Sequence, residues 1–239
     1  VGTNHFMPEN LVHYFPLPEF LRNAIKNFGW WQFRKVYDKL NLVTTPTQTA
    51  ADLTKKSGLT KTIIPISNGI DMEKFNPQNK GEYLRKKYSL PDKPLLITVG
   101  RLDKEKNVDM LLKALKSVSK NIDLHFAIVG KGNERANLEK LAIKLGIAER
   151  VTFLGFVPDD ELPRLYAISS CFINACTAEL QCIAAMEAMA SGLPIIAINA
   201  LALPELVQSG ENGFLRQRRS SPSWSRGPTP PTRAISGRA

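Results

Sequence analysis

The sequence has little cysteine, and the cysteines it has are not arranged as a site. Its 239 residues include only three, at positions 171, 176 and 182, with no CxxC spacing and no nearby histidine. An odd number of unclustered cysteines argues against a disulfide framework and against a zinc site. We therefore interpret Cys171, Cys176 and Cys182 as buried, reduced thiols of a cytoplasmic protein.

Long hydrophobic runs and targeting segments are also missing. No run of about 18 apolar residues occurs, which argues against a membrane-spanning helix. The first residues, Val-Gly-Thr-Asn-His-Phe, lack the basic and then apolar order of a signal peptide, and they lack an initiator methionine. We expect a chain that begins within a longer protein.

Charge is distributed unevenly along the chain. The formal net charge is +10, but residues 216–239 contain six arginines and no acidic residue. The other residues hold 26 basic and 22 acidic side chains, a net +4, and show no zinc-finger, RNP or KH pattern. Binding to nucleic acid therefore has little support. Because residues 216–239 also lack apolar periodicity, we expect them to be disordered, and we favour a non-native extension over a basic tether to lipid or nucleic acid.

The first part of the chain has a strand and helix pattern within an ordinary globular composition of 43% hydrophobic and 23% charged residues. Helical spacing of apolar residues over 17–40 predicts one long helix, or two short helices broken at Gly29. A strand is expected at 42–45, a helix at 47–57 with Thr47 as its N-cap, and a strand at 62–67. This order implies a parallel pair, and the polar stretch 71–80 is the expected domain boundary.

The alternation of strands and helices is more regular after residue 80. We expect strands at 94–100, 124–130, 151–154, 171–175 and 194–198, and helices at 108–119, 133–145, 159–168 and 180–192. Five apolar strands that alternate with amphipathic helices predict a doubly wound parallel sheet, with a ligand crevice at the carboxyl ends of the strands. We expect Gly100, Gly130, Gly155 and Glu179 on one rim, because each follows a strand end.

Residues 179–194 hold two carboxylates, Glu179 and Glu187, around a helix of small residues that Gly192 and Pro194 should end. If the whole interval were helical, the two residues would lie about 12 Å apart along the axis. That spacing is too long for an acid and base pair acting on one bond, which needs about 5 to 9.5 Å. We therefore expect the two carboxylates to bind two ends of one elongated ligand.

Two cations follow the strand expected at 94–100. Arg101 comes directly after it, and Lys106 precedes the next helix. Cations beside a helix N-terminus can bind a diphosphate, although two solvated surface cations would give the same pattern. Gly130-Lys131-Gly132 is a fragment of a dinucleotide fingerprint without its third glycine, and it is weak evidence for NAD or FAD.

Taken together, several motifs resemble the retaining glycosyltransferases of family 4, which have the GT-B fold. The glutamate pair matches their E-x7-E signature. Asn68-Gly69-Ile70-Asp71 with Phe75 resembles the segment before their C-terminal domain, and Thr3-Asn4-His5 resembles a Thr-x-His near the acceptor site. The other matching segments are Gly100-Arg101 with Lys106-Asn107, Phe153-Leu154-Gly155, and Leu162-Pro163-Arg164-Leu165-Tyr166.

The resemblance implies an α/β protein of GT-B type, with two Rossmann-like domains that contain parallel sheets. Residues 1–78 would be the second half of a truncated N-terminal, acceptor-side domain and its linker, and residues 79–215 the C-terminal domain that binds the nucleotide sugar. The family's glycine-rich donor loop and its terminal returning helix have no counterpart in this chain.

The resemblance also implies a role for each candidate residue. Glu187 would bind the ribose hydroxyls, Glu179 a hydroxyl of the donor hexose, and Arg101 with Lys106 the leaving diphosphate. His5 would face the reacting sugar from the opposite domain, and the alternative is a polar histidine at a strand end. Further donor contacts are expected from Gly130, Gln181, Cys182 and Ile183. Cys182 departs from the family, because many relatives have glycine or another small residue at this place.

The implied reaction transfers a hexose from a UDP- or GDP-sugar to a hydroxyl of a lipid or a saccharide, with retention of anomeric configuration. No cofactor or metal is expected, and the chain has no Asp-x-Asp motif. A basic helix with Phe28, Trp30 and Trp31 indicates peripheral contact with an anionic membrane, or else a helix packed on its own sheet. The rival functions are a nucleotide-sugar-binding module without turnover and a dinucleotide-dependent oxidoreductase.

Overall fold

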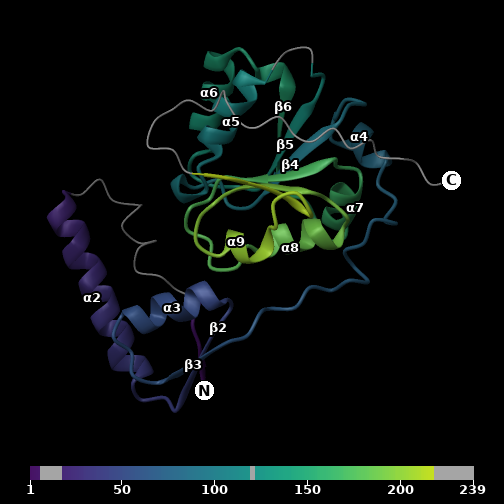
Figure 1. The fold of residues 1–239 in the computed structure, drawn as a ribbon. Helices are drawn as coiled ribbons and strands as arrows, with labels where there is room; N and C mark the ends of the chain where they lie inside the picture. Colours follow the sequence, from purple (N-terminus) through teal and green to yellow (C-terminus); the bar gives the residue numbers. More distant parts are fainter. Residues whose placement is uncertain (6–17, 119–121, 218–239) are drawn as a thin grey trace.

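The computed structural model describes residues 1–5, 18–118 and 122–217 and shows two α/β lobes joined by the segment that follows strand β3 (Figure 1). The first lobe holds a three-stranded sheet and the second a six-stranded sheet. Every pairing between named strands is parallel. The prediction of an α/β protein with two parallel sheets is therefore confirmed.

In the first lobe the strands lie in the order β1-β2-β3. The elements are β1 (Gly2–Thr3), α2 (Glu19–Tyr37), β2 (Leu42–Thr45), α3 (Gln48–Lys56) and β3 (Thr62–Pro65). Helix α2 continues through Gly29, so the predicted region forms one long helix. The Thr47 side chain accepts a hydrogen bond from the Ala50 N–H, which confirms the predicted N-cap of α3.

Helix α2 buries only part of its apolar surface. Phe33 is buried with Val43 and Leu59, and Trp30 and Tyr37 pack at the edge of this cluster. The outer surface of the helix exposes Phe20, Leu21, Phe28, Trp31 and Val36. Across the described residues, no helix is both long enough and apolar enough to cross a membrane. Helix α2 thus packs on its own lobe and also presents an apolar outer face.

The second lobe is doubly wound, with strand order β6-β5-β4-β7-β8-β9. Its strands are β4 (Leu95–Val99), β5 (His125–Val129), β6 (Val151–Gly155), β7 (Cys171–Asn174), β8 (Ile195–Ile198) and β9 (Gly213–Arg216). Its helices are α4 (Tyr83–Lys87), α5 (Val108–Ser117), α6 (Arg135–Leu145), α7 (Leu162–Ala167), α8 (Ile183–Ala190) and α9 (Leu203–Leu206), with 3-10 helices η2 (Lys104–Lys106) and η3 (Ala148–Arg150). All five predicted strands are present.

Two hydrophobic clusters cover the two faces of this sheet. Helices α5 and α6 lie over one face, where Leu112 and Phe126 are fully buried. Helices α8 and α9 lie over the other face, where Tyr166 and Ala185 are fully buried (Figure 1). Strands buried on both faces must be apolar at nearly every position, and that is why their sequences are continuous apolar runs.

Strand β9 is an addition to the predicted set, and it includes Arg216, which the composition assigned to the tail. Gly213 pairs with Ile195 of β8, and a Cβ at Gly213 would lie 2.0 Å from the Ile195 carbonyl oxygen. Only glycine permits this close pairing. The sheet therefore continues one residue beyond the boundary expected at 215. The predicted disorder of residues 218–239 lies outside the described residues.

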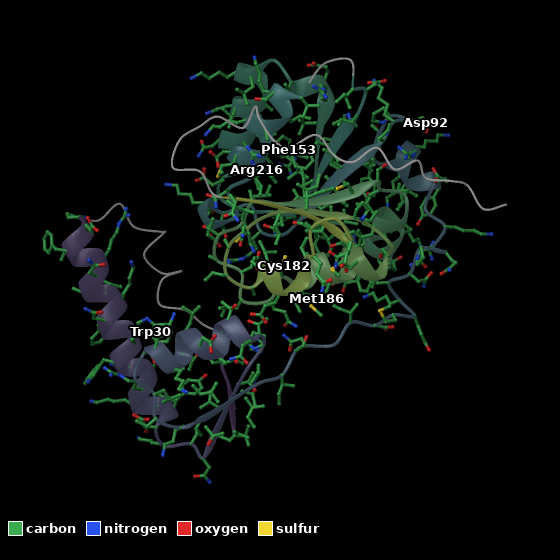
Figure 2. The ribbon with its side chains drawn as sticks, viewed as in Figure 1. Trp30, Asp92, Phe153, Cys182, Met186 and Arg216 are labelled. Carbon is green, nitrogen blue, oxygen red and sulfur yellow. The ribbon has the colours of Figure 1, made fainter. Side chains whose placement is uncertain are left out.

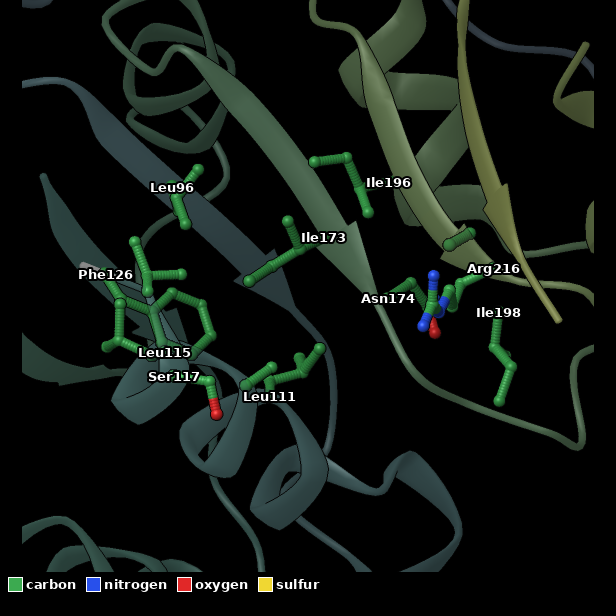
Figure 3. Close-up of a pocket in the computed structure, with 13 residues that line it drawn as sticks. Leu96, Leu111, Leu115, Ser117, Phe126, Ile173, Asn174, Ile196, Ile198 and Arg216 are labelled. Carbon is green, nitrogen blue, oxygen red and sulfur yellow. The ribbon is translucent and has the colours of Figure 1, made fainter. Parts of the chain in front are cut away.

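The α5 face of the sheet is covered incompletely by the described residues. A groove of about 350 Å³ lies between α5 and strands β7 and β8 (Figure 3). Leu111 and Leu115 line it from α5, and Ile173, Ile196 and Ile198 line it from the strands. The Ile196 side chain keeps 42% exposure, so this apolar surface is open.

The carboxyl ends of β4, β5 and β6 lie side by side, as predicted for Gly100, Gly130 and Gly155. The Gly130 N–H donates to the Gly155 carbonyl at 2.7 Å, and the Gly100 N–H donates to the Val129 carbonyl at 3.0 Å. Gly130 has φ 133°, and a Cβ there would lie 1.8 Å from the Gly100 carbonyl oxygen. A side chain at Gly130 would push these strand ends apart.

Candidate functional site

A cleft of about 360 Å³ lies between the two lobes. It is lined from the first lobe by His5, Pro46 and Asn68, and from the second by Val99, Gly100, Arg101, Glu105, Lys106, Cys176, Ala178, Glu179, Leu180, Gln181, Cys182, Ile183 and Ala184. These second-lobe residues follow β4 and β7, the neighbouring strands at which the sheet reverses its direction of winding. Open α/β sheets bind ligands at this switch point, so the cleft is the expected site.

The loop 175–182 forms the floor of the cleft, and Asn174 shapes it. The Asn174 side-chain oxygen accepts from the Cys176 N–H at 2.6 Å, and its amide donates to the Cys182 sulfur at 3.0 Å. Cys182 has φ 64°, a left-handed conformation that favours glycine. Such a conformation would favour the glycine or small residue that the resemblance implies at this place.

The left-handed Cys182 also corrects the predicted helix start. Helix α8 begins at Ile183 rather than near Leu180, so Glu179 lies in the loop and only Glu187 lies in the helix. Figure 2 labels Cys182 at the start of this helix and Met186 one turn later. The spacing of about 12 Å, which assumed a helix throughout, does not apply.

All three cysteines are buried and free, as predicted. Burial raises the pKa of Cys171 to about 11. Burial likewise raises the pKa of Cys176 and of Cys182 to about 12, and the neighbouring Glu179 carboxylate adds to both. The thiols are therefore protonated at neutral pH, and they act as packing groups rather than as nucleophiles.

Lys106 and Glu179 meet inside the cleft. The Lys106 ammonium donates to the Glu179 carboxylate at 2.7 Å, and both side chains are mostly buried. Burial lowers the pKa of Lys106, but the Glu179 carboxylate together with Cys176 and Cys182 outweighs this, and the resulting pKa lies above the ordinary value. Asn107, in a left-handed conformation, donates to the Ala175 carbonyl at 3.1 Å and joins the two segments. Lys106 is therefore a fixed, charged group.

Arg101 lies in the same cleft but is much more open. Its guanidinium forms ion pairs with Asp103 at 3.2 Å and with Glu105 at 3.0 Å, while 68% of the side chain remains exposed. The structure thus brings Arg101 and Lys106 together, as predicted. Arg101 is thus paired but exposed, whereas Lys106 is paired and mostly buried.

The N-terminus of α8 adds backbone donors to this wall. Ile183 and Ala184 are its first two residues, and both line the cleft. The first N–H groups of a helix have no acceptor within the helix, and the helix dipole is positive there. With Lys106 opposite, the arrangement can bind a doubly charged anion.

Glu187 and Gly130 do not line the cleft itself. Glu187 lies one turn beyond Ile183 on the same side of α8, where it is half-buried and accepts from the Tyr166 hydroxyl at 3.1 Å. Burial raises the pKa of Glu187, although the Tyr166 hydrogen bond and the charge of Lys74 oppose the rise. Gly130 shapes the strand ends behind Arg101. The predicted contacts of these two residues with a ligand remain predictions.

His5 reaches the cleft from the end of β1 in the first lobe. Its neighbour Asn4 is buried, and the Asn4 N–H donates to the Thr44 carbonyl at 2.8 Å. The Asn4 amide also donates to the Thr54 hydroxyl at 3.2 Å. These bonds fix the backbone at His5, whose own side chain is exposed. The histidine therefore lines the same cleft as Glu179 and Gln181.

Residues of the first lobe and of the segment after β3 form hydrogen bonds with the loop 175–182. The Thr47 hydroxyl donates to the Leu180 carbonyl at 2.8 Å. The Gln181 side chain accepts from the Asn68 amide and donates to the Ser67 hydroxyl at 2.7 Å. The side chain of Gln181, a predicted donor contact, therefore forms hydrogen bonds with Ser67 and Asn68.

A second contact between the lobes involves a carboxylate that sequence reasoning missed. The Glu205 carboxylate accepts from the N–H groups of Gln48 at 3.1 Å and Thr49 at 2.6 Å, at the N-terminus of α3. A carboxylate at a helix N-terminus is favourable because of the unpaired N–H groups and the dipole. The sequence around Glu205 has no local pattern that predicts a contact with a residue 157 positions away.

Metal-ligating side chains do not cluster in the part of the chain that the structure describes. No group of three or more His, Cys, Asp or Glu residues there has an arrangement that could hold a metal ion. The reaction's independence of metal remains a prediction.

Comparison with known proteins shows that this chain is similar to glycosyltransferases. The family model described as "Glycosyl transferases group 1" matches residues 80–227. A GDP-mannose-dependent alpha-(1-6)-phosphatidylinositol monomannoside mannosyltransferase of Mycobacterium tuberculosis is 36% identical over 161 residues, which are 64% of this chain and 42% of that protein. A sulfoquinovosyl transferase of Arabidopsis thaliana is 34% identical over 154 residues, which are 62% of this chain and 29% of that protein. The chain spans less than half the length of these relatives.

Solved structures show the same fold. The structure of Anabaena HepE in complex with UDP-glucose has a TM-score of 0.74 and 25% identity, over 83% of this chain and 56% of that chain. WaaG, a glycosyltransferase involved in lipopolysaccharide biosynthesis, has a TM-score of 0.66 and 22% identity, over 75% of this chain and 50% of that chain. The GT-B fold predicted from the sequence is confirmed.

Replacing Glu187 with glutamine should stabilise the unliganded protein at neutral pH. Burial raises the pKa of Glu187, so the folded state disfavours the charged carboxylate that the unfolded chain carries readily. A raised pKa contributes stability that is present at low pH and is lost as the pH rises. The gain in free energy of unfolding from Glu187→Gln should therefore be largest near pH 7 and shrink as the pH falls toward 4.5.

Urea denaturation across this pH range measures the effect. The control is Glu149→Gln, which removes an exposed carboxylate at η3. A gain that does not depend on pH, or a loss of stability at pH 7, would contradict the burial of Glu187.

Proposed function

The chain belongs to the glycosyl transferases group 1 family, and from this membership we propose that it is part of a hexosyltransferase that uses a nucleotide-diphosphate sugar. One observation carries the proposal. Arg101, Lys106, Glu179 and the N-terminus of α8 line a single cleft at the switch point of the second sheet. We further propose the family 4 type of transfer, which retains the anomeric configuration at the donor carbon.

In this proposal the diphosphate binds between Lys106 and the N-terminus of α8. Departure of a nucleoside diphosphate develops negative charge, which fixed cations and backbone N–H groups stabilise without a metal ion. The raised pKa of Lys106 keeps its ammonium charged in the cleft. An ammonium has three N–H donors, so Lys106 can keep its bond to Glu179 and also bind a phosphate oxygen. Arg101 would turn from its two carboxylates to the outer phosphate.

The hexose and the ribose would occupy opposite sides of the diphosphate. Glu179 accepts from Lys106 through one carboxylate oxygen, and an ionised carboxylate has enough lone pairs to accept from a hexose hydroxyl as well. His5 would approach the donor carbon or the acceptor from the first lobe. The nucleoside would extend along α8 past Ala184, so that the ribose hydroxyls meet Glu187, which Tyr166 holds in place.

Relatives supply the donors to be tested. One relative is GDP-mannose-dependent, and one solved neighbour holds UDP-glucose. The same mannosyltransferase relative acts on a phosphatidylinositol mannoside, which makes a lipid acceptor the first choice for this chain. A saccharide acceptor is the alternative.

Replacing Lys106 with alanine should lower the affinity for UDP or GDP by about tenfold or more, because one charge-assisted contact to the diphosphate is lost. Calorimetric titration of the 239-residue chain with UDP, GDP and NADH measures this affinity. Lys104→Ala is the matched control, since Lys104 belongs to the same 3-10 helix but does not line the cleft.

Four results would separate the possible functions. Binding of NADH alone would refute the assignment, as would a Lys106→Ala variant that binds both nucleotides normally. Nucleotide binding without donor hydrolysis or sugar transfer would favour a nucleotide-sugar-binding module. Transfer activity with either donor would establish the enzyme.

We also propose that α2 contacts an anionic membrane through its exposed apolar face. Phe28 and Trp31 are 59% and 42% exposed, and their rings contact one another with centroids 5.7 Å apart. The Lys35 ammonium lies 4.0 Å from the centroid of the Trp31 ring. Aromatic rings flanked by lysine are suited to the interface between headgroups and acyl chains.

Replacing both Phe28 and Trp31 with glutamine should reduce binding to anionic vesicles by about tenfold, because two aromatic side chains would no longer leave water. Sedimentation of the chain with phosphatidylserine vesicles and with phosphatidylcholine vesicles measures this binding. Ile143→Gln is the control, since Ile143 is 69% exposed on α6 of the other lobe. Absence of pelleting that depends on anionic lipid would sink the proposal.

A further inference from the structure

A second pocket lies in the first lobe between α2 and α3, outside the cleft. It has a volume of about 310 Å³, and it is lined by Asn27, Trp30, Arg34, Leu53, Lys56 and Ser57. None of these residues lines the cleft between the lobes. The pocket lies by the C-terminal end of α3, whereas the N-terminal end of α3 contacts Glu205 of the second lobe. The two sites therefore use opposite ends of one helix.

The pocket holds two cations that no carboxylate neutralises within the described part of the chain. Neither Arg34 nor Lys56 forms an ion pair there with an acidic side chain. Asp52, one turn before Lys56 on α3, accepts instead from the Gln48 side chain at 2.8 Å. Residues 18–61 contain eight basic and three acidic residues. The local potential is therefore positive, and the pocket favours an anion.

Arg34 is positioned by backbone packing rather than by a counter-ion. Gly58 follows α3 in a left-handed conformation, with φ 91°. A Cβ at this position would lie 2.9 Å from a guanidinium nitrogen of Arg34. The missing side chain lets the guanidinium lie against the backbone at the pocket wall, where the side chain is half-buried. This placement limits the ordering that Arg34 must undergo when a ligand binds.

The remaining lining groups suit a ligand that is anionic at one end only. Trp30 packs edge-on against Phe33 with ring centroids 5.4 Å apart, which fixes its indole beside the pocket. Leu53 adds a second apolar surface, and Asn27 adds an amide donor. Pockets that combine an apolar wall with a few convergent polar groups bind small organic ligands rather than bare ions.

We propose that this pocket binds a phosphate ester. The Arg34 guanidinium and the Lys56 ammonium bind its phosphate oxygens, and Trp30 with Leu53 contacts the alcohol to which the phosphate is attached. A guanidinium matches two phosphate oxygens at once, and an ammonium adds a point charge. Two sources supply such a group, namely a phospholipid headgroup and a soluble phosphate ester. This site is independent of the donor cleft and of the proposed reaction.

Glycerol 3-phosphate in solution, and vesicles of phosphatidylcholine with and without phosphatidic acid, are the probes that distinguish the two sources. The test variant is Arg34→Gln with Lys56→Gln in the whole 239-residue chain. The control is Lys39→Gln with Lys55→Gln, which removes the same charge from exposed residues outside the pocket. Thermal unfolding with UDP checks that both variants are folded, and it reports on the donor cleft separately.

The pocket variant should lose about tenfold or more in affinity for the probe that binds, while the control should lose about twofold at most. Such a loss with glycerol 3-phosphate would identify a soluble ester as the ligand. The same loss only with phosphatidic acid vesicles would identify a lipid headgroup. Equal losses in the two variants, or binding of neither probe to the unchanged chain, would overturn the proposal.

Discussion

The loop 175–182 is the constraint on which the rest of the site depends, because it is held from both sides. From the second sheet, Asn174 bonds the loop at Cys176 and at Cys182. From the first lobe, Thr47 bonds the Leu180 carbonyl, and Asn68 bonds the Gln181 amide. Between these hydrogen bonds, Cys182 adopts a left-handed conformation, and α8 begins at the next residue. The same constraint brings Glu179 to Lys106 and points the helix N-terminus into the cleft.

Charge and burial divide the cleft into parts with different tasks. Lys106 is paired and mostly buried, so it is fixed before any ligand arrives, whereas Arg101 is exposed and pairs with two carboxylates. Beyond the cleft on α8, burial raises the pKa of Glu187, and the Tyr166 hydroxyl already donates to its carboxylate. In our proposal, a nucleoside diphosphate attached to a sugar matches this arrangement, with hydroxyls at both ends and charge in the middle.

The strands of the second sheet could be predicted from the sequence, because they depend on local signals. Most candidate residues line one cleft, but Gly130 and Glu187 do not. Apolar runs followed by glycines mark the strands. The carboxyl ends of parallel strands lie at the same edge of a sheet, so residues that follow them come together there. The start of α8 was predicted too early, since the left-handed Cys182 follows from the bonds of Asn174 and not from helix propensity. Strand β9 was not predicted, because it runs into the arginine-rich segment that begins at Arg216. The contact of Glu205 with α3 depends on how the two lobes pack, which no local pattern records.

Hydrogen–deuterium exchange of the whole chain with and without UDP tests the central claim that the cleft binds a nucleoside diphosphate. Amide protons at the N-terminus of α8, from 183 to 187, and in the segment 100–107 should exchange more slowly when UDP is bound. Exchange at residues 131–135, which follow Gly130 in the fragment of a dinucleotide motif, should stay unchanged. Slower exchange confined to 131–135, or no slowing anywhere at saturating UDP, would contradict the account.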